Sequence, residues 1–293
     1  MTDRQKSLAL VVLALFVQQI LGALTFPVAK FGLQTLEPFA FAFFRFTLST
    51  AVLLLIVRVR THQRVIERED RWRIFWLGVL IVLLNQVTYL VGQSLTAANH
   101  GSVLFATTPI FIYILARVHL KEPMTVRKSV GISLAVTGVL VIVSQGAINL
   151  GTDYLLGDFI ILVAVIAWAY YTIIGRPLVQ KYGALRVTAY ALASGSAVYF
   201  PYGVYRALIA DYSAVTVTTW LSVAYAAIGT SVVVYVLWYW VLKQMEASRV
   251  AVYHNFQPIV ASGVAYVFLG EPLGAAFVIG GAIVLAGVVT TEI

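Results

Sequence analysis

Polar residues recur at helical spacing inside several long apolar stretches of this sequence. The clearest set occupies positions i, i+3, i+4, i+7 and i+11 of one stretch and consists of Asn85, Thr88, Tyr89, Gly92 and Thr96. Residues at these intervals share one face of a helix. Amides and hydroxyls on such a face bind small polar molecules through hydrogen bonds, and lipid offers them no partner. The spacing therefore predicts faces that line a cavity.

Aromatic residues accompany these polar groups, and together they define a candidate ligand cavity. Its predicted lining is Gln18, Gln19, Asn85, Tyr89, Ser102, Trp168, Tyr171, Tyr235, Trp238, His254 and Gln257. Flat aromatic walls beside amides and hydroxyls suit an amino acid or an organic cation. Each aromatic taken singly also fits a plainer role in packing or at the lipid interface, as expected for Trp240 on the opposite helical face from Trp238.

Two prolines, Pro109 and Pro258, stand at matching interior positions of apolar stretches. Proline removes one backbone donor, so both helices are expected to bend and to free the carbonyls of Phe105 and His254. We interpret the pair as candidate hinges. A static kink rescued by neighbouring threonine hydroxyls is the alternative.

Two side chains of the apolar stretches, His254 and Arg45, could act through their charge. His254 has a pKa range that would permit proton-linked gating, although a histidine near a membrane interface is often only hydrogen-bonded. Arg45 costs on the order of 2.5 to 3.5 kcal/mol to place inside a span. It would either hold a carboxylate or, as the sequence favours, snorkel or join a polar contact between helices.

Several kinds of chemistry lack their residues. The chain has no cysteine, which excludes disulfides, thiolate metal sites and cysteine nucleophiles. It has no HExxH motif, Walker loop or paired Asp-rich motif, so we expect neither an enzyme nor a bound metal or cofactor. Acidic residues avoid the middle of every apolar stretch, which leaves coupling through a buried carboxylate without a carrier.

The elements that position these residues are membrane helices. The 293 residues are 61% hydrophobic and only 11% charged, with a mean hydropathy of +0.91, which excludes an ordinary soluble domain. A spanning helix needs about 20 mostly apolar residues. Ten stretches fit, at 8–29, 38–57, 73–94, 99–116, 125–144, 155–175, 187–207, 216–241, 250–269 and 273–290. The fold class is thus an all-α integral membrane protein.

The basic residues indicate how the ten spans are oriented. The net charge of +8 would suggest nucleic acid in a soluble chain, but here it reports topology. The N-terminus and the loops after the even-numbered spans hold 17 of the 20 Lys and Arg, whereas the opposite side has only Lys30 and Arg206. By the positive-inside rule, both termini are cytoplasmic.

An internal repeat divides the chain. Residues 98–138 and 247–287 align without a gap at a shift of 149, with matching Pro, Glu-Pro and Gly positions. Five spans per repeat is an odd number, so the second copy is inserted upside down, as the exchanged distribution of Lys and Arg also indicates. We expect two inverted five-helix domains, 1–150 and 151–293. Small residues at Gly131, Ala135, Ala276 and Gly280 predict close helix packing, within the chain or with a second protomer.

This pattern resembles the drug/metabolite transporter superfamily with two EamA-type domains, over about residues 8–290. The resemblance is carried by the Pro-containing fourth and ninth spans, each with a following Glu-Pro turn, and by the segments FPVAK (26–30) and FFRF (43–46). Within the superfamily the chain is similar to YddG-like bacterial exporters of aromatic amino acids. The resemblance implies ten helices, a central cavity between the halves and alternating access.

The sequence thus predicts a facilitative exporter of amino acids in the bacterial inner membrane. A multidrug or organic-cation exporter of the same superfamily is the first alternative, and a passive channel or structural membrane subunit is the second. Sugar-phosphate carriers need intramembrane Lys or Arg, and only Arg45 is present. The expected partners are a small-molecule substrate and the lipid bilayer, with no nucleic acid, and the oligomeric state stays open.

Overall fold

The structure is a computed structural model that describes residues 3–59, 66–96, 101, 104–144, 154–257, 259–260 and 275–292. Over these ranges the ordered secondary structure is helical, without strands. The α-helices are α1 (Asp3–Gly32), α2 (Pro38–Val59), α3 (Arg68–Val79), α4 (Thr88–Leu95), α6 (Thr108–Leu120), α7 (Val126–Ser144), α8 (Leu155–Tyr182), α9 (Ala184–Ile209), α10 (Val217–Ala224), α11 (Tyr235–Leu242), α12 (Ala247–Val252) and α14 (Ala275–Glu292).

Within the described ranges, five helical rods are long and apolar enough to cross a membrane. They are Leu10–Gly32, Pro38–Val59, Arg68–Leu95, Leu155–Tyr182 and Val217–Leu242. A helix satisfies its backbone internally, which lipid requires. Several helices continue past the apolar stretch that predicted them, because backbone pairing does not end where the side chains become charged. Arg176 and Lys181, expected in a loop, therefore belong to the last turns of α8.

Two of the rods are π-helical in the middle. The segment η1 (Leu80–Val87) joins α3 to α4, and η3 (Tyr225–Val234) joins α10 to α11. A π-helical turn takes in extra residues and so rotates the following side chains around the axis, and such turns are frequent at functional sites. Both segments lie in the centre of the bundle, where they pack against α8 and α1, respectively.

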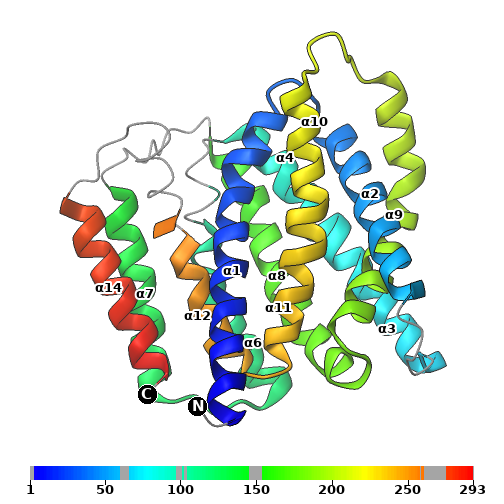
Figure 1. Cartoon of the computed structure of the whole chain (residues 1–293). Coiled ribbons are helices and arrows are strands. Elements are labelled where there is room, and N and C mark those ends of the chain that lie inside the picture. The colour runs from blue at the N-terminus through cyan, green and yellow to red at the C-terminus, as the bar shows by residue number, and fades with distance from the viewer. Residues whose placement is uncertain are drawn as a thin grey trace.

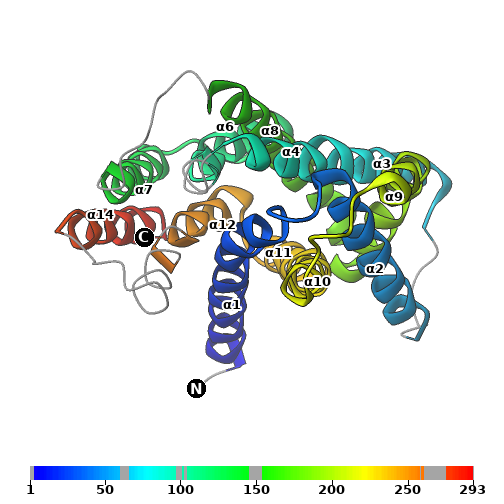
Figure 2. The ribbon, with the colours of Figure 1, turned by 90° about the horizontal axis from the view of Figure 1, so that it is seen from above.

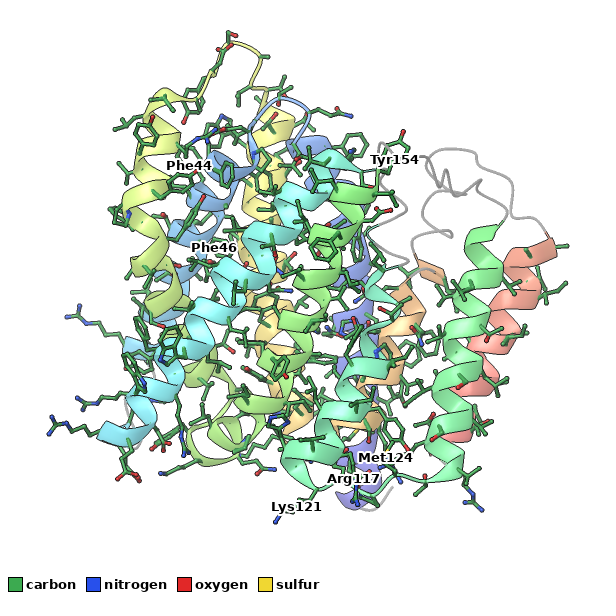
Figure 3. All side chains as sticks on the ribbon, turned by 180° about the vertical axis from the view of Figure 1, so that it is seen from behind. Phe44, Phe46, Arg117, Lys121, Met124 and Tyr154 are labelled. Carbon is green, nitrogen blue, oxygen red and sulfur yellow. The ribbon has the colours of Figure 1, made fainter. Side chains whose placement is uncertain are left out.

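The helices form a main bundle with one helix pair beside it (Figures 1 and 2). The N- and C-terminal ends lie at the same end of the molecule, called the terminal end below. Arg117, in the last turn of α6, and Lys121, just after it, also lie at this end, whereas Tyr154, just before α8, lies at the opposite end (Figure 3). Helix α1 thus starts at the terminal end and α8 starts at the other.

The pair beside the bundle consists of α7 and α14, which pack along each other. Their contact depends on small residues: a Cβ atom added at Gly138 would lie 2.6 Å from the Gly280 carbonyl oxygen, and one at Gly287 would lie 2.6 Å from that of Gly131. The predicted close packing of these helices is confirmed. The partner of α7 is a helix of the same chain.

Pro109 does not interrupt a helix as the sequence predicted. It lies in the first turn of α6, which starts at Thr108 after a turn at Ala106 and Thr107. A first-turn proline lacks only a donor that would have no intrahelical partner, so it costs little. The expected interior kink is therefore wrong for Pro109, where the chain breaks between two helical segments. Pro258 and Ser102 lie outside the described residues.

Candidate functional site

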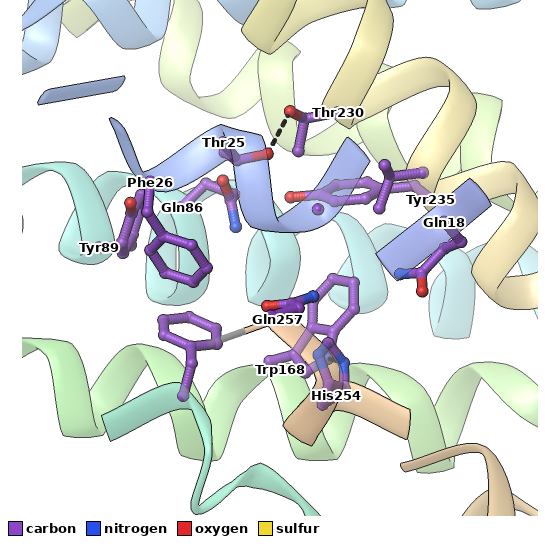
Figure 4. A pocket seen from close by; sticks show the side chains of 13 residues that line it. Gln18, Thr25, Phe26, Gln86, Tyr89, Trp168, Thr230, Tyr235, His254 and Gln257 are labelled. Carbon is purple, nitrogen blue, oxygen red and sulfur yellow. Dashed lines mark hydrogen bonds between the residues drawn. The ribbon is translucent and has the colours of Figure 1, made fainter. Parts of the chain in front are cut away.

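A pocket lies in the centre of the main bundle, where both π-helical rods face α1, α8 and the 3-10 turn η4 (Tyr253–Asn255) (Figure 4). It holds about 450 Å³ of space free of protein atoms, its open mouth included. The described lining residues are Gln18, Gly22, Thr25, Phe26, Gln86, Tyr89, Phe105, Trp168, Thr230, Val234, Tyr235, His254 and Gln257.

One wall of the pocket is a cluster of three rings from the first half of the chain. Phe26, Tyr89 and Phe105 meet edge to face, with ring centroids 5.6 to 5.9 Å apart. Each ring comes from a different element, so the cluster fixes α1, α4 and the segment before α6 against one another. Edge-to-face contact of this kind stabilises an aromatic pair by about 0.5–1.5 kcal/mol beyond burial alone.

The facing wall is aromatic as well and comes from the second half of the chain. The Trp168 ring lies 5.3 Å from that of Tyr235, and both residues line the pocket. Behind them, Trp238 is 5.6 Å from Trp168 and donates its indole N–H to the Thr172 hydroxyl at 3.1 Å. A flat ligand between the two walls would contact aromatic surface on both sides.

Amides and hydroxyls complete the lining. The Thr25 and Thr230 hydroxyls are 2.8 Å apart and tie α1 to η3 at the pocket. Both amide atoms of the buried Gln18 have no hydrogen-bond partner among the described residues. A Cβ at Gly22 would lie 2.7 Å from the Gln257 amide nitrogen, so glycine there lets Gln257 approach α1. The pocket therefore offers unused donors and acceptors beside its aromatic walls.

His254 is buried and accepts a hydrogen bond. The Trp168 indole N–H donates to its Nε2 atom at 3.1 Å, and the His254 ring lies 4.6 Å from that of Trp238. An Nε2 atom that accepts this bond carries no proton, so the neutral ring has its proton on Nδ1. Protonating Nε2 would break the contact with Trp168. The geometry thus favours a neutral His254 that holds Trp168 in place.

Six of the predicted cavity residues line the pocket: Gln18, Tyr89, Trp168, Tyr235, His254 and Gln257. The other described ones are buried outside the pocket lining, and they are Gln19, Asn85, Tyr171 and Trp238. Asn85 donates to the Ala164 carbonyl at 2.7 Å, and Tyr171 stacks on Tyr239 at 4.7 Å.

Gln86 lines the pocket where Asn85 was predicted to do so. Both lie in η1, whose π-helical turns shift the facing side chain by one position relative to an α-helix. The same effect in η3 places Thr230 and Val234 in the lining and leaves Trp238 behind it. Thr25 and Gly22 carry a sequence signal, because they share a helical face with Gln18. Phe26 and Phe105 are apolar and carry none.

Arg45 does not snorkel. It is fully buried in α2, and its Nε–H donates to the Ser231 hydroxyl of η3 at 2.9 Å. The alternative expected from the sequence, a polar contact between helices, is what the structure contains. Ser231 in turn donates to the Ala226 carbonyl at 3.1 Å, so the contact fixes α2 against the π-helical turn.

A second polar cluster lies at the terminal end. The buried Glu122 carboxylate accepts from Arg176 Nη1 at 2.8 Å, from the Ala247 N–H at 2.9 Å and from the Ser248 hydroxyl at 2.7 Å. It therefore caps the start of α12, where a carboxylate satisfies free backbone donors. Because α12 leads to His254, the cluster ties this end of the bundle to the pocket.

Two segments of the chain, 9–144 and 155–292, each match the EamA-like transporter family. An uncharacterized transporter of Archaeoglobus fulgidus is 30% identical over 95% of this chain and 96% of its own. The uncharacterized transporter YyaM of Bacillus subtilis is 28% identical over 92% and 88%. A probable terminal-alkyne amino-acid exporter of Streptantibioticus cattleyicolor is 26% identical over 94% and 91%.

The fold also has a relative among solved structures. One crystal structure superposes with a TM-score of 0.78 at 17% identity and covers 96% of each chain. Apolar helices of spanning length, a central pocket and the double family match agree with one another. The chain belongs to the EamA-like transporter family, and it is a multi-pass membrane transporter with two copies of the family's repeat.

Proposed function

We propose that this protein exports amino acids, with a preference for aromatic ones, across the bacterial inner membrane by alternating access. The observation that carries the proposal is the central pocket, whose two aromatic walls come from the two halves of the chain. A site shared by two halves changes its access when one half moves against the other. The related probable amino-acid exporter supports the same substrate class.

We further propose that the halves, 1–150 and 151–293, are inverted copies. Their first helices, α1 and α8, start at opposite ends of the molecule. The contacts between the halves include two pairs of corresponding helices, α2 with α9 and α7 with α14. The first helix of each half also packs on the π-helical segment of the other half, α1 on η3 and α8 on η1.

One lysine and one arginine bind backbone carbonyls in equivalent places of the two halves, which supports the same symmetry. Lys30 donates to the carbonyls of Gln93 at 3.2 Å and Thr96 at 3.1 Å. Arg176 donates to the two carbonyls 149 positions later, at 3.2 and 3.0 Å. The last turn of each π-containing rod is thus held by a cation from the first helix of a half. Because the basic side of membrane proteins is cytoplasmic, the terminal end faces the cytoplasm in this proposal.

Transport is facilitative in this proposal. Acidic residues are absent from the described pocket lining, and the His254 imidazole is engaged with Trp168. Proton exchange through His254 is the second version, and it requires breaking the bond to Trp168.

The test is counterflow of labelled L-phenylalanine and other amino acids in proteoliposomes. We expect saturable, stereoselective counterflow that persists when an imposed pH gradient is collapsed. Trp168→Ala removes one of the two rings of the second aromatic wall and is expected to reduce counterflow at least about tenfold. Trp76→Ala is the matched control, because this tryptophan is exposed on α3 away from the pocket and should leave counterflow unchanged.

Other outcomes point to the alternatives. Non-saturable flux without stereoselectivity indicates a channel, and the absence of flux for every amino acid contradicts amino-acid export. Saturable counterflow of a quaternary ammonium compound alone indicates a cation exporter. Flux that stops when the pH gradient is collapsed contradicts facilitative transport and supports proton exchange.

A further inference from the structure

Arg45 carries an unpaired charge in the middle of the bundle. Its side chain is fully buried, and its Nε–H donates to the Ser231 hydroxyl at 2.9 Å. The Nη1 and Nη2 atoms, which hold most of the guanidinium donors, have no partner there. The ring of Phe46, 5.3 Å from the guanidinium carbon, adds a cation–π contact but no counter-charge.

Arg45 differs from two other cationic residues, each of which has an acidic partner. Arg176 pairs with Glu122, and Lys128 pairs with Glu246. No ion pair within the described ranges includes Arg45, and the ionisable groups that act on it are the hydroxyls of Tyr235 and Tyr89. A buried charge without a partner is costly, by several kcal/mol. An anionic ligand would supply the missing charge.

The two tyrosines connect Arg45 to the pocket. Tyr89 and Tyr235 both line it, and their buried hydroxyls have no hydrogen-bond partner among the described residues. Tyr235 points its hydroxyl toward the side of the pocket where Gln86 and Tyr89 lie (Figure 4). A tyrosine hydroxyl can accept from a guanidinium with its oxygen and donate its proton to an anion at the same time. Arg45 thus reaches η3 at Ser231, next to Thr230 in the pocket lining, and the two unpartnered hydroxyls belong to that same lining.

We propose that this side of the pocket binds the carboxylate of the substrate, with Tyr89 and Tyr235 as the direct donors and Arg45 as the positioning residue behind them. This inference rests on the proposed function, since it names the chemical group by which the same pocket selects amino acids. The guanidinium orients both hydroxyl protons toward the pocket and stabilises the bound negative charge. The two aromatic walls then hold the side chain of the ligand.

The experiment compares three probes that share the phenylalanine side chain and differ at the amino or the carboxyl group. L-phenylalanine and N-acetyl-L-phenylalanine carry a carboxylate, and L-phenylalaninamide lacks it. Binding of each probe to the purified full-length protein in detergent is measured by titration calorimetry and by the ligand-induced rise in Tm. We expect both carboxylates to bind at least tenfold more tightly than the amide, because a hydrogen bond to a charged group is roughly twice as strong as a neutral one.

Variants assign this preference to Arg45. Arg45→Gln is expected to remove the preference while binding of the amide stays within about twofold, and Arg45→Lys is expected to restore part of it. A general loss of structure would weaken the binding of all three probes together. It would therefore not change the ratio of carboxylate binding to amide binding. Arg206→Gln is the matched control, because this arginine pairs with Glu37 away from the pocket and its loss should leave the ratio unchanged.

The outcomes separate this inference from the proposed function. Equal binding of L-phenylalanine and its amide by the wild-type protein overturns the carboxylate site, whether or not amino-acid counterflow occurs. This test uses only the wild-type protein, so it holds even if Arg45→Gln does not fold. A carboxylate preference that persists in Arg45→Gln overturns the role of Arg45. Tight, Arg45-dependent binding of carboxylates without any amino-acid counterflow would support the anion site and contradict amino-acid export.

Discussion

At the residue scale, Glu246 links two helices at the terminal end through one charge. Its carboxylate accepts from Lys128 Nζ at 2.7 Å, across the gap between α7 and the start of α12. This hydrogen bond holds the pKa of Glu246 below its usual range. A lowered folded-state pKa stabilises the protein above the unfolded-state value, about 4.3 for Glu, and the effect disappears as pH falls through the folded-state pKa.

We therefore expect Glu246→Gln to lower Tm at pH 7 and to match the wild-type Tm once the pH falls below the lowered pKa. Thermal unfolding in detergent, followed from pH 7 into the acid range, measures both. Glu69→Gln is the control, because Glu69 is an exposed acid at the start of α3. A Tm difference for Glu246→Gln that is the same at every pH would show that the contact is not electrostatic.

The sequence identified which side chains are polar in lipid but not which of them face the pocket. Gln18, His254 and Gln257 reach it, whereas Gln19 and Asn85 are buried outside its lining. All five are costly in lipid, so each signals a protein or water neighbour without telling the two apart. The choice depends on rotation about the helix axis, which packing determines.

At the element scale, the contact of α7 with α14 is close enough to exclude one methyl group. A Cβ at Gly287 would lie 2.6 Å from both the Ala135 nitrogen and the Gly131 oxygen, which are backbone atoms that cannot rotate away. Gly281, on the same helix, has open space around the same position. The two glycines therefore form a matched pair for substitution.

We expect Gly287→Ala to force the two helices apart and to destabilise the protein by about 1–3 kcal/mol, the usual cost of overpacking. Gly281→Ala is expected to be neutral or stabilising by up to about 1 kcal/mol, since alanine favours the helix. Thermal unfolding of both variants in detergent is the measurement. Equal Tm values would mean that the two helices can separate without cost.

The sequence predicted where helices lie better than how they are wound. Their positions follow from runs of apolar residues, but nothing in the composition of Leu80–Val87 or Tyr225–Val234 distinguishes π-helical from α-helical turns. Each of these segments packs against the first helix of the other half, a contact that the local sequence does not show. That is why Gln86 and Thr230 were missed. The same limit applies to Pro109. A proline indicates that a helix is interrupted nearby, but it does not show whether the helix ends before it or begins at it.

At the scale of the whole molecule, the proposed orientation can be tested with single cysteines, because the natural chain has none. Ser213 is exposed between α9 and α10, and Lys243 is exposed after α11. We expect a membrane-impermeant maleimide to label Ser213→Cys in intact spheroplasts and Lys243→Cys only after permeabilisation. The reverse pattern would place the terminal end outside, and labelling of both in intact spheroplasts would contradict a spanning bundle.

The architecture as a whole was largely predictable, since helix positions, small-residue packing and the family all follow from the sequence. The partner of α7 was not. Spacing of small residues shows that backbones approach closely but does not identify the neighbour. Only the folded chain shows that α7 of the first half meets α14 of the second.

That contact bears on how such a chain arose. In a protein containing only the first half, the small-residue face of α7 would be uncovered. It could be covered only when the protein met another molecule in the membrane. Joining two copies in one polypeptide keeps the matching face permanently at a high effective concentration. Once joined, each copy is free to diverge, because pairing no longer requires the two faces to be identical.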